Sequence, residues 1–248
     1  MNMPSNHKKV ILITGASRGI GAFTATLLAQ QGHQIVINYA RNDLEANQVV
    51  EKITAAGGTA SAFKADISQS HQVERLFDYV IQNYGRMDIL INNAGIMCFQ
   101  KIETLDDETI EKVLAINLKG SLYTMREAAK RLEQGGKIIN LSSSVIGMKL
   151  EGYGIYSASK AAIEALTAIL AKELRGRNIS VNAIAPGPTA TELFFEGKSE
   201  ALIEQLAKAA PLERLGTVED IAAVLDFAVS DASNWINAQV IRANGGII

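Results

Sequence analysis

The chain has 248 residues, 48% of them hydrophobic, and its 24 basic and 26 acidic side chains leave a net charge of −2. This length and apolar content suffice for a full hydrophobic core, and we expect one domain over residues 1–248. The balanced charge gives no electrostatic reason to expect nucleic acid as a partner. The single cysteine excludes an internal disulfide. His7, His33 and His71 lack the spacing of zinc ligands, so no metal site is expected.

No segment has the pattern of an export signal or a membrane-spanning helix. The first nine residues are mostly polar, and the apolar run at 10–13 is far shorter than a signal-peptide core. No uninterrupted apolar stretch approaches the roughly 20 residues that a spanning helix needs. We therefore expect a soluble, cytoplasmic protein with no membrane partner.

Short apolar segments alternate with longer amphipathic segments along the chain. The short segments, rich in Val and Ile, predict buried strands at 10–14, 34–39, 60–66, 87–93, 137–143, 179–185 and 239–243. The amphipathic segments predict helices near 20–31, 43–56, 70–84, 106–132, 157–175 and 217–229. This alternation indicates an α/β fold: a single doubly wound, Rossmann-type parallel sheet of about seven strands with helices on both faces. The segment 187–216 has no strand pattern and predicts a small, mostly helical substrate lid.

A glycine-rich turn follows the first strand and opens the first helix. It reads Thr14-Gly15-Ala16-Ser17-Arg18-Gly19-Ile20-Gly21, a G-x-x-x-G-x-G spacing. Glycines there let the backbone approach a pyrophosphate, and the helix N-terminus offers free N–H groups. The alternative is a glycine-rich turn without a ligand. The strand before it and the helix after it favour a dinucleotide site.

The end of the second strand lacks the acidic residue that commonly holds the ribose of NAD. The stretch reads Asn38-Tyr39-Ala40-Arg41, and we expect Asp43, which follows, to be a helix N-cap. Arg41, with Arg18 on the other side, suits a 2′-phosphate through charge and fork geometry. Two solvated surface arginines are the alternative. Together with the missing acid, the pair favours NADP(H).

Tyr156 and Lys160 are four residues apart and should share one helix face. A nearby ammonium lowers the pKa of a phenol, which would make Tyr156 a proton donor or acceptor near neutral pH. An ordinary tyrosine with an exposed lysine is the alternative, because pairs at this spacing are abundant.

These elements occur in an ordered set that resembles the short-chain dehydrogenases/reductases over essentially the whole chain. The set comprises residues 14–21, Asn92-Asn93-Ala94-Gly95, Asn117, the serines at 142–144, Tyr156, Lys160, Pro186-Gly187 and the terminal Asn244-Gly245-Gly246. One departure is Ala238, which stands where many members have Gly.

The resemblance implies a catalytic set of Asn117, Ser143, Tyr156 and Lys160. Tyr156 would protonate the substrate carbonyl, Ser143 would hydrogen-bond to its oxygen, Lys160 would hold the nicotinamide ribose and Asn117 would anchor a water. Ser143 is chosen over Ser142 and Ser144 by its spacing of 13 residues before the tyrosine. The residues implied to bind the cofactor are Gly15, Ser17, Arg18, Gly19, Ile20, Gly21, Asn38, Tyr39, Ala40, Arg41, Asp66, Ile67, Asn93, Ala94, Gly95, Tyr156, Lys160, Pro186, Gly187, Thr189 and Thr191.

The implied function is NADPH-dependent reduction of a small, hydrophobic aldehyde or ketone, reversible in principle. The residues expected around the substrate are Ile96, Met97, Cys98, Val145, Ile146, Met148, Tyr153, Phe194 and Phe195. The alternatives are a 3-oxoacyl-carrier-protein reductase, which the acidic lid disfavours, and an NAD-linked alcohol or polyol dehydrogenase. A non-catalytic dinucleotide sensor is a remote alternative. The resemblance also implies a homotetramer or homodimer assembled through the helices at 106–132 and 157–175.

Overall fold

The computed structural model describes residues 8–248, so His7 and the residues before it lie outside the described part. One parallel sheet runs through the molecule in the order β3-β2-β1-β4-β5-β6-β7. Its strands are β1 (Val10–Ile13), β2 (Gln34–Tyr39), β3 (Thr59–Lys64), β4 (Ile89–Asn92), β5 (Lys137–Leu141), β6 (Ser180–Pro186) and β7 (Val240–Ala243). Each predicted strand overlaps an observed one, with bounds moved by at most two residues, and the predicted doubly wound fold is confirmed.

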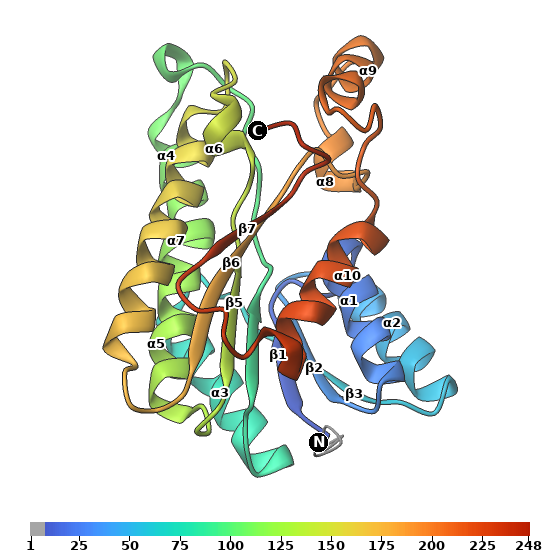
Figure 1. Ribbon diagram of the computed structural model, residues 1–248, viewed down its shortest axis with the longest axis vertical. Coiled ribbons are helices and arrows are strands. Elements are labelled where there is room, and N and C mark those ends of the chain that lie inside the picture. Colours follow the sequence, from blue (N-terminus) through green and yellow to red (C-terminus); the bar gives the residue numbers. More distant parts are fainter. Residues whose placement is uncertain (1–7) are drawn as a thin grey trace.

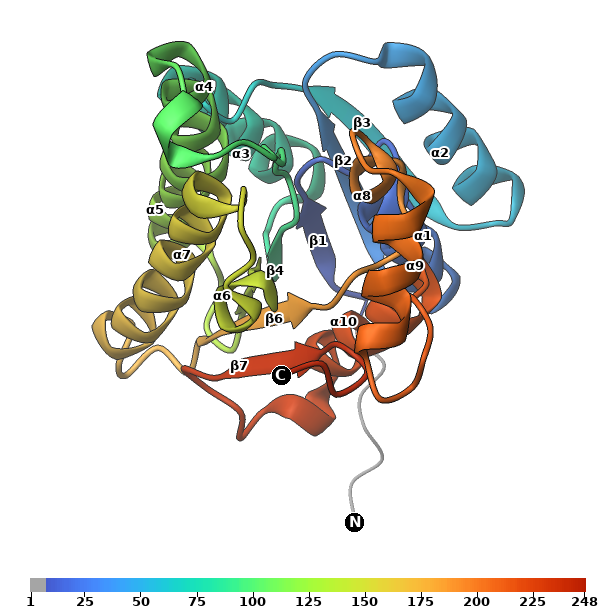
Figure 2. The same cartoon turned by 90° about the horizontal axis from the view of Figure 1, so that it is seen from above.

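Helices cover both faces of the sheet (Figures 1 and 2). On one face lie α1 (Gly19–Gln30), α2 (Asp43–Ala55) and α10 (Val218–Val229). On the other lie α3 (Ser70–Tyr84), α4 (Asp107–Val113), α5 (Ser121–Arg131) and α7 (Gly154–Glu173). The shorter elements are α6 (Val145–Met148), α8 (Glu192–Phe195), α9 (Glu200–Ala209) and the 3-10 turns η1 (Ile102–Thr104) and η3 (Asp231–Ser233).

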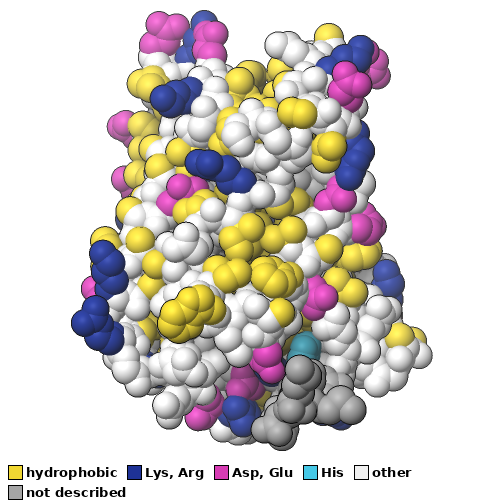
Figure 3. Space-filling model, viewed as in Figure 1, with side chains coloured by type: hydrophobic (Ala, Val, Ile, Leu, Met, Phe, Trp, Pro, Cys, Tyr) yellow, Lys and Arg dark blue, Asp and Glu magenta, His cyan; other side chains and the backbone are white. Residues whose placement is uncertain are grey.

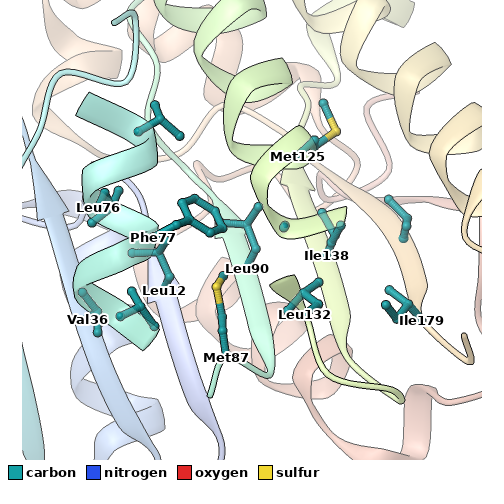
Figure 4. Close-up of a cluster of buried hydrophobic side chains, with 14 of the residues drawn as sticks. Leu12, Val36, Leu76, Phe77, Met87, Leu90, Met125, Leu132, Ile138 and Ile179 are labelled. Carbon is teal, nitrogen blue, oxygen red and sulfur yellow. The ribbon is translucent and has the colours of Figure 1, made fainter. Parts of the chain in front are cut away.

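Side chains alternate along each strand and feed two separate cores. In β1, Val10 and Leu12 pack into the cluster around Phe77 of α3, whereas Ile11 and Ile13 pack into the cluster that includes Leu28 of α1. Figure 4 shows the Phe77 ring between Leu12 and Leu90 in the first of these clusters. Successive strand residues point to opposite faces, so strands covered on both sides need apolar residues at nearly every position.

The predicted helix at 106–132 is interrupted by a π-helical stretch, η2 (Leu114–Gly120), between α4 and α5. Asn117 lies in this stretch and is fully buried. Its main-chain oxygen accepts a hydrogen bond from the Ser121 hydroxyl at 2.9 Å. Short π segments inside α-helices frequently occur at functional sites.

The N-cap of α2 and the first residue of α7 differ from the sequence-based prediction. The N-cap of α2 is Asn42, whose side chain accepts from the Glu45 N–H at 3.2 Å, so the prediction for Asp43 is wrong. Asp43 instead accepts a hydrogen bond from the Tyr39 hydroxyl at 2.9 Å and pairs with Lys64 at 2.8 Å. Helix α7 begins at Gly154, before the predicted residue 157, which places Tyr156 inside its first turn.

The segment 187–216 contains α8 and α9, and a bridge between Thr189 and Gly216 closes its base. Both helices have side-chain N-caps, Thr191 for α8 and Ser199 for α9. Within residues 8–248, no helix has the length and apolar character to cross a membrane.

Candidate active site

A cleft of about 910 Å³ opens at the carboxyl edge of the sheet, where β1, β4, β5 and β6 end. The lid helix α8 closes part of it, and Figure 2 looks onto this edge. Ligands of open α/β sheets bind outside the carboxyl ends of the strands, at the switch in strand order. Here that switch lies between β1 and β4.

Most of the residues predicted to bind a cofactor line this one cleft. They are Gly15, Ser17, Arg18, Gly19, Ile20, Asn38, Ala40, Arg41, Asp66, Ile67, Asn93, Ala94, Gly95, Tyr156, Lys160, Pro186, Gly187, Thr189 and Thr191. Gly21 and Tyr39 do not line it. Gly21 lies beneath the glycine turn, and the Tyr39 hydroxyl points to Asp43.

The glycine turn is packed tightly from below and open towards the cleft. Gly15 has a φ of 61°, and a Cβ there would lie 2.7 Å from the Ala94 Cα. A Cβ on Gly21 would lie 2.6 Å from the Asn93 Nδ2. By contrast, a Cβ on Gly19 would meet only the Thr191 methyl, at 3.9 Å. The turn is therefore a backbone cradle with free space above it at a helix N-terminus, which fits a pyrophosphate.

The buried Thr14 and the half-buried Asn93 tie this cradle to the loop after β4. The Asn93 side chain donates to the main-chain oxygens of Thr14 and Gly15, both at 2.9 Å. The Thr14 hydroxyl accepts from the main-chain N–H groups of Asn93 and Ala94, both at 3.1 Å. Asn93 thus positions the turn from beneath.

The side chains at the end of β2 divide into buried supports and exposed cations. Asn38 is buried and donates to the Ala65 oxygen at 2.9 Å, which joins β2 to the loop that carries Asp66. Arg41 is exposed at the cleft edge. Arg18 is also exposed, and its guanidinium pairs with Glu192 of α8 at 2.8 Å. Arg18 thus links the glycine turn to the lid, a contact that the sequence did not indicate.

Tyr156, Ser143 and Lys160 meet in the middle of the cleft. The Ser143 hydroxyl is hydrogen-bonded to the Tyr156 phenol. Lys160 is buried, donates to the Leu141 oxygen at 2.7 Å and lies 5.8 Å from the centroid of the Tyr156 ring. The i, i+4 geometry of α7 thus brings the tyrosine and the lysine to the same side, as the spacing predicts.

The three neighbouring serines have different partners. Ser142 donates to the Glu164 carboxylate at 2.7 Å, and Ser144 donates to the Ala185 oxygen at 3.0 Å. Only the hydroxyl of Ser143 contacts the phenol. The choice of Ser143 from spacing therefore agrees with its position beside Tyr156.

Burial shifts the pKa values of the two central groups in opposite directions. Burial raises the pKa of Tyr156 to about 12, and the hydrogen bond with Ser143 acts against this rise. Burial lowers the pKa of Lys160 to about 8. The expectation that Lys160 lowers the pKa of Tyr156 is wrong for this arrangement, since the ammonium donates to a carbonyl and desolvation of the phenol dominates.

Asn117 does not line the cleft and acts on its wall. Its Oδ1 accepts from the Ile96 N–H at 2.8 Å, and its Nδ2 donates to the Ile96 oxygen at 2.9 Å. The Nδ2 also donates to the Ser159 hydroxyl at 3.2 Å. The amide therefore fixes the loop after Gly95 against the helix that bears Tyr156.

The segment after β6 is held by the C-terminal residues. A Cβ on Gly187 would lie 2.8 Å from the Asn244 Cα, and the Asn244 amide donates to Ser144 at 2.9 Å. Thr189 donates to the Gly187 oxygen at 2.9 Å, and Thr191 caps α8. Thr189 and Thr191 thereby lie where the lid meets the cleft.

The predicted substrate pocket is met in part. Ile96, Met97, Val145, Met148, Tyr153 and Phe194 line the cleft. Cys98, Ile146 and Phe195 do not, and Phe195 is 42% exposed with its ring against Phe194. These three lie outside the lining of the cleft because neighbours in sequence point to different sides of a loop or a short helix.

Several lining residues were not predicted from the sequence. They are Asn42, Glu45, Ala65, Lys112, Ile116, Leu141, Ser142, Leu150, Pro188, Ala190, Glu192, Leu193, Glu196, Leu206 and Val218. Most of them adjoin a residue of the predicted site and could have been found by that adjacency, such as Ser142 beside Ser143 and Ala190 between Thr189 and Thr191. The residues without such a neighbour are Glu45, Lys112, Leu141, Leu150, Leu206 and Val218. Among the described residues, no His, Cys, Asp or Glu cluster could hold a metal ion.

Comparison with known proteins places these features in context. Residues 15–248 match the family model described as enoyl-(acyl carrier protein) reductase. A short-chain type dehydrogenase/reductase of Picea abies is 44% identical over 96% of this chain and 92% of its own. NADPH-dependent aldehyde reductase 2, chloroplastic, of Arabidopsis thaliana is 41% identical over 97% of this chain and 94% of its own. A short-chain dehydrogenase of Burkholderia cenocepacia solved in complex with NADP is 33% identical, with a TM-score of 0.91 over 96% of this chain and 97% of that one.

Proposed function

Because this chain belongs to the short-chain dehydrogenase/reductase family, we propose that it reduces a small aldehyde or ketone with NADPH. The observation that carries the proposal is the meeting of Tyr156, Ser143 and Lys160 in the same cleft as the glycine cradle and two exposed arginines. The relatives named as NADPH-dependent aldehyde reductases and the NADP complex of a similar structure support the choice of cofactor and substrate class.

The residues present fit the cofactor. Gly15 and Gly19 leave room for its phosphates at the N-terminus of α1, while Arg18 and Arg41 offer guanidinium groups to a 2′-phosphate. Asp66 and Ile67 would face the adenine, and Pro186, Gly187, Thr189 and Thr191 would face the nicotinamide; all six line the cleft. When bound, NADPH would supply the hydride for the carbonyl carbon.

In this proposal Tyr156 supplies the proton. Its pKa of about 12 keeps the phenol protonated at neutral pH, so it can donate to the carbonyl oxygen as charge develops there. Ser143 donates a hydrogen bond to the same oxygen. Removal of one such donor typically lowers kcat by about 10²–10³-fold. Lys160 holds the cofactor ribose, and Asn117 positions the loop that faces it.

Two alternatives concern the substrate. The matched family model is described by an acyl-carrier-protein substrate, which demands docking of an acidic partner. Glu192, Glu196, Glu200 and Glu204 make the lid acidic, which favours a free small molecule. An NAD-linked alcohol dehydrogenase is disfavoured by the absence of a carboxylate at Asn38–Arg41.

The test is oxidation of NADPH and of NADH, followed by absorbance across a panel of aldehydes, ketones and acyl thioesters. Tyr156→Phe is expected to lower the rate with NADPH by about 10²–10⁴-fold while NADPH binding persists. Tyr123→Phe, outside the cleft, is the matched control and should keep full activity. Turnover that survives in Tyr156→Phe, or that occurs with NADH alone, would contradict the proposal.

We further propose that residues 1–248 form one catalytic domain, with 187–216 as its substrate lid. The enzyme is proposed to act in the cytoplasm on a small-molecule substrate as a homotetramer or homodimer.

A further inference from the structure

Lys198 of the lid lies beside three cleft residues that were predicted to contact the substrate. It follows α8, and its ammonium donates to the Phe194 oxygen at 2.6 Å. The ammonium lies 4.8 Å from the centroid of the Phe194 ring and 5.9 Å from that of Tyr153. It also lies 3.9 Å from the sulfur of Met97. Met97, Tyr153 and Phe194 all line the cleft, so the cation lies against a mainly apolar part of its wall, with Glu192 and Glu196 as the acidic lining residues of the lid.

Lys198 forms no ion pair among residues 8–248, although Glu196 is near enough to raise its pKa. By contrast, Lys208 on the same lid pairs with Glu204 at 2.6 Å. An ammonium has three donors, and at Lys198 the Phe194 oxygen takes one while the Met97 sulfur is a weak acceptor.

The surroundings of Lys198 leave its charge poorly solvated. Burial lowers the pKa of Lys198, and the charge of nearby Glu196 acts in the opposite direction. Glu192, the other acid on this side of the lid, is paired with Arg18. A half-buried cation with unused donors gains from an anion that enters beside it, since hydrogen bonds between charged groups are the stronger ones.

The position of Lys198 relative to Tyr156 determines where on a substrate such an anionic group would have to lie. Tyr153 neighbours both groups: the centroid of its ring lies 5.9 Å from the Lys198 ammonium and 6.5 Å from the centroid of the Tyr156 ring. A substrate whose carbonyl oxygen meets Tyr156 and whose body crosses Tyr153 reaches Lys198 with its far end.

We propose that Lys198 is a specificity-determining residue that selects carbonyl substrates with a carboxylate on the side remote from the reacting carbon. The body of the substrate would lie against Met97, Tyr153 and Phe194, and the carboxylate would take the free donors of Lys198. This inference rests on the proposed reductase function and narrows its substrate class from hydrophobic carbonyls to amphipathic oxo acids.

The experiment compares 4-carboxybenzaldehyde with the neutral 4-methylbenzaldehyde in the wild type and in Lys198→Met. The substitution keeps the apolar stem and removes the charge. We expect kcat/KM for the carboxylated aldehyde to fall about 10–100-fold, mainly through KM, with a change below about threefold for the neutral one. Lys198→Arg should retain most of the preference. Lys208→Met, on the same lid, is the matched control and should leave both substrates unaffected.

A binding measurement separates this inference from the reductase proposal. Calorimetric titration with 4-carboxybenzyl alcohol and 4-methylbenzyl alcohol requires no turnover. Tighter binding of the carboxylated alcohol that disappears in Lys198→Met would support the role of Lys198 even if no aldehyde is reduced. Equal binding of the two alcohols, or equal losses for both substrates in Lys198→Met, would overturn it.

Discussion

The phenol of Tyr156 and the ammonium of Lys160 are both desolvated, and desolvation disfavours the charged form of each. The phenol therefore holds its proton more strongly and the ammonium less strongly than in water, with pKa values of about 12 and about 8. A protonated phenol is the form that carbonyl reduction needs. The charge of Lys160, in contrast, is lost within the range in which enzymes are assayed.

These values predict how the reaction depends on pH. The kcat/KM for aldehyde reduction should be constant below about pH 7 and fall as pH rises through about 8, because Lys160 loses its charge there while Tyr156 stays protonated. The profile is measured from pH 6 to 10 by NADPH oxidation. A profile that is flat or rising through pH 8 would contradict the assignment.

The free energy of unfolding should rise with pH in the range where activity falls, so an effect on catalysis can be told from an effect on stability. The pKa of Lys160 is depressed on folding from 10.5 to about 8, so its charged form opposes folding below pH 8. Burial depresses the pKa of Lys137, in β5, in the same way. Between about pH 8 and 10.5 both contributions to the free energy of unfolding rise with pH. A loss of activity in this range is therefore not expected to come from unfolding.

At the scale of elements, the turn between β1 and α1 and the loop after β4 are built as one unit. Gly15 is placed against Ala94, and Asn93 donates to both carbonyls of the turn. The π-helical stretch fixes the other wall of the cleft, since it turns Asn117 towards Ile96. Each side of the cleft is thus fixed by a side-chain amide, that of the half-buried Asn93 on one side and that of the buried Asn117 on the other.

The packing of the turn predicts a difference between two glycine substitutions. Gly15→Ala places a Cβ 2.7 Å from Ala94 and should lower the free energy of unfolding by about 2–5 kcal/mol, from left-handed strain and overpacking. Gly57→Ala has a φ of 82° but nothing within 4 Å of its Cβ. It should cost only the strain, about 1–2 kcal/mol. Urea unfolding of both variants measures the difference, and equal losses would show that the contact with Ala94 contributes nothing.

At the scale of the whole molecule, the sheet separates two cores and leaves apolar side chains on the outer surface. Ile169 of α7 is 51% exposed and Leu122 of α5 is 42% exposed. Trp235, before β7, is 99% exposed. On the face that bears β7, hydrophobic side chains gather towards the middle and most charged ones lie at the periphery (Figure 3). Such surfaces are typical of assembly between copies.

One charged substitution on the surface of α7 tests the proposed assembly through α5 and α7. The wild-type chain of 26.6 kDa should sediment as a dimer or tetramer, and Ile169→Glu should shift it towards the monomer by burying an unpaired carboxylate. Leu44→Glu, on α2 and 67% exposed, is the control and should keep the wild-type mass. Sedimentation velocity distinguishes these outcomes. A wild-type monomer, or an unchanged mass in Ile169→Glu, would contradict the assembly.

The sequence alone determined the strands, the main helices and the fold class. Strands covered on both faces are apolar at nearly every position, and that pattern is local to each segment. The sequence also indicated most of the cofactor-binding candidates. Their motifs lie at the ends of predicted strands, and a parallel sheet brings those ends to one edge.

Only the tertiary structure decided which neighbours in sequence face the cleft. It turned Ser143, but neither Ser142 nor Ser144, to Tyr156, and it turned Ile146 and Phe195 away from the predicted pocket. It also set the pKa values of Tyr156 and Lys160 and brought Lys198 beside Tyr153. Desolvation and contacts between distant segments depend on how elements pack, and the spacing of residues along the chain does not contain that information.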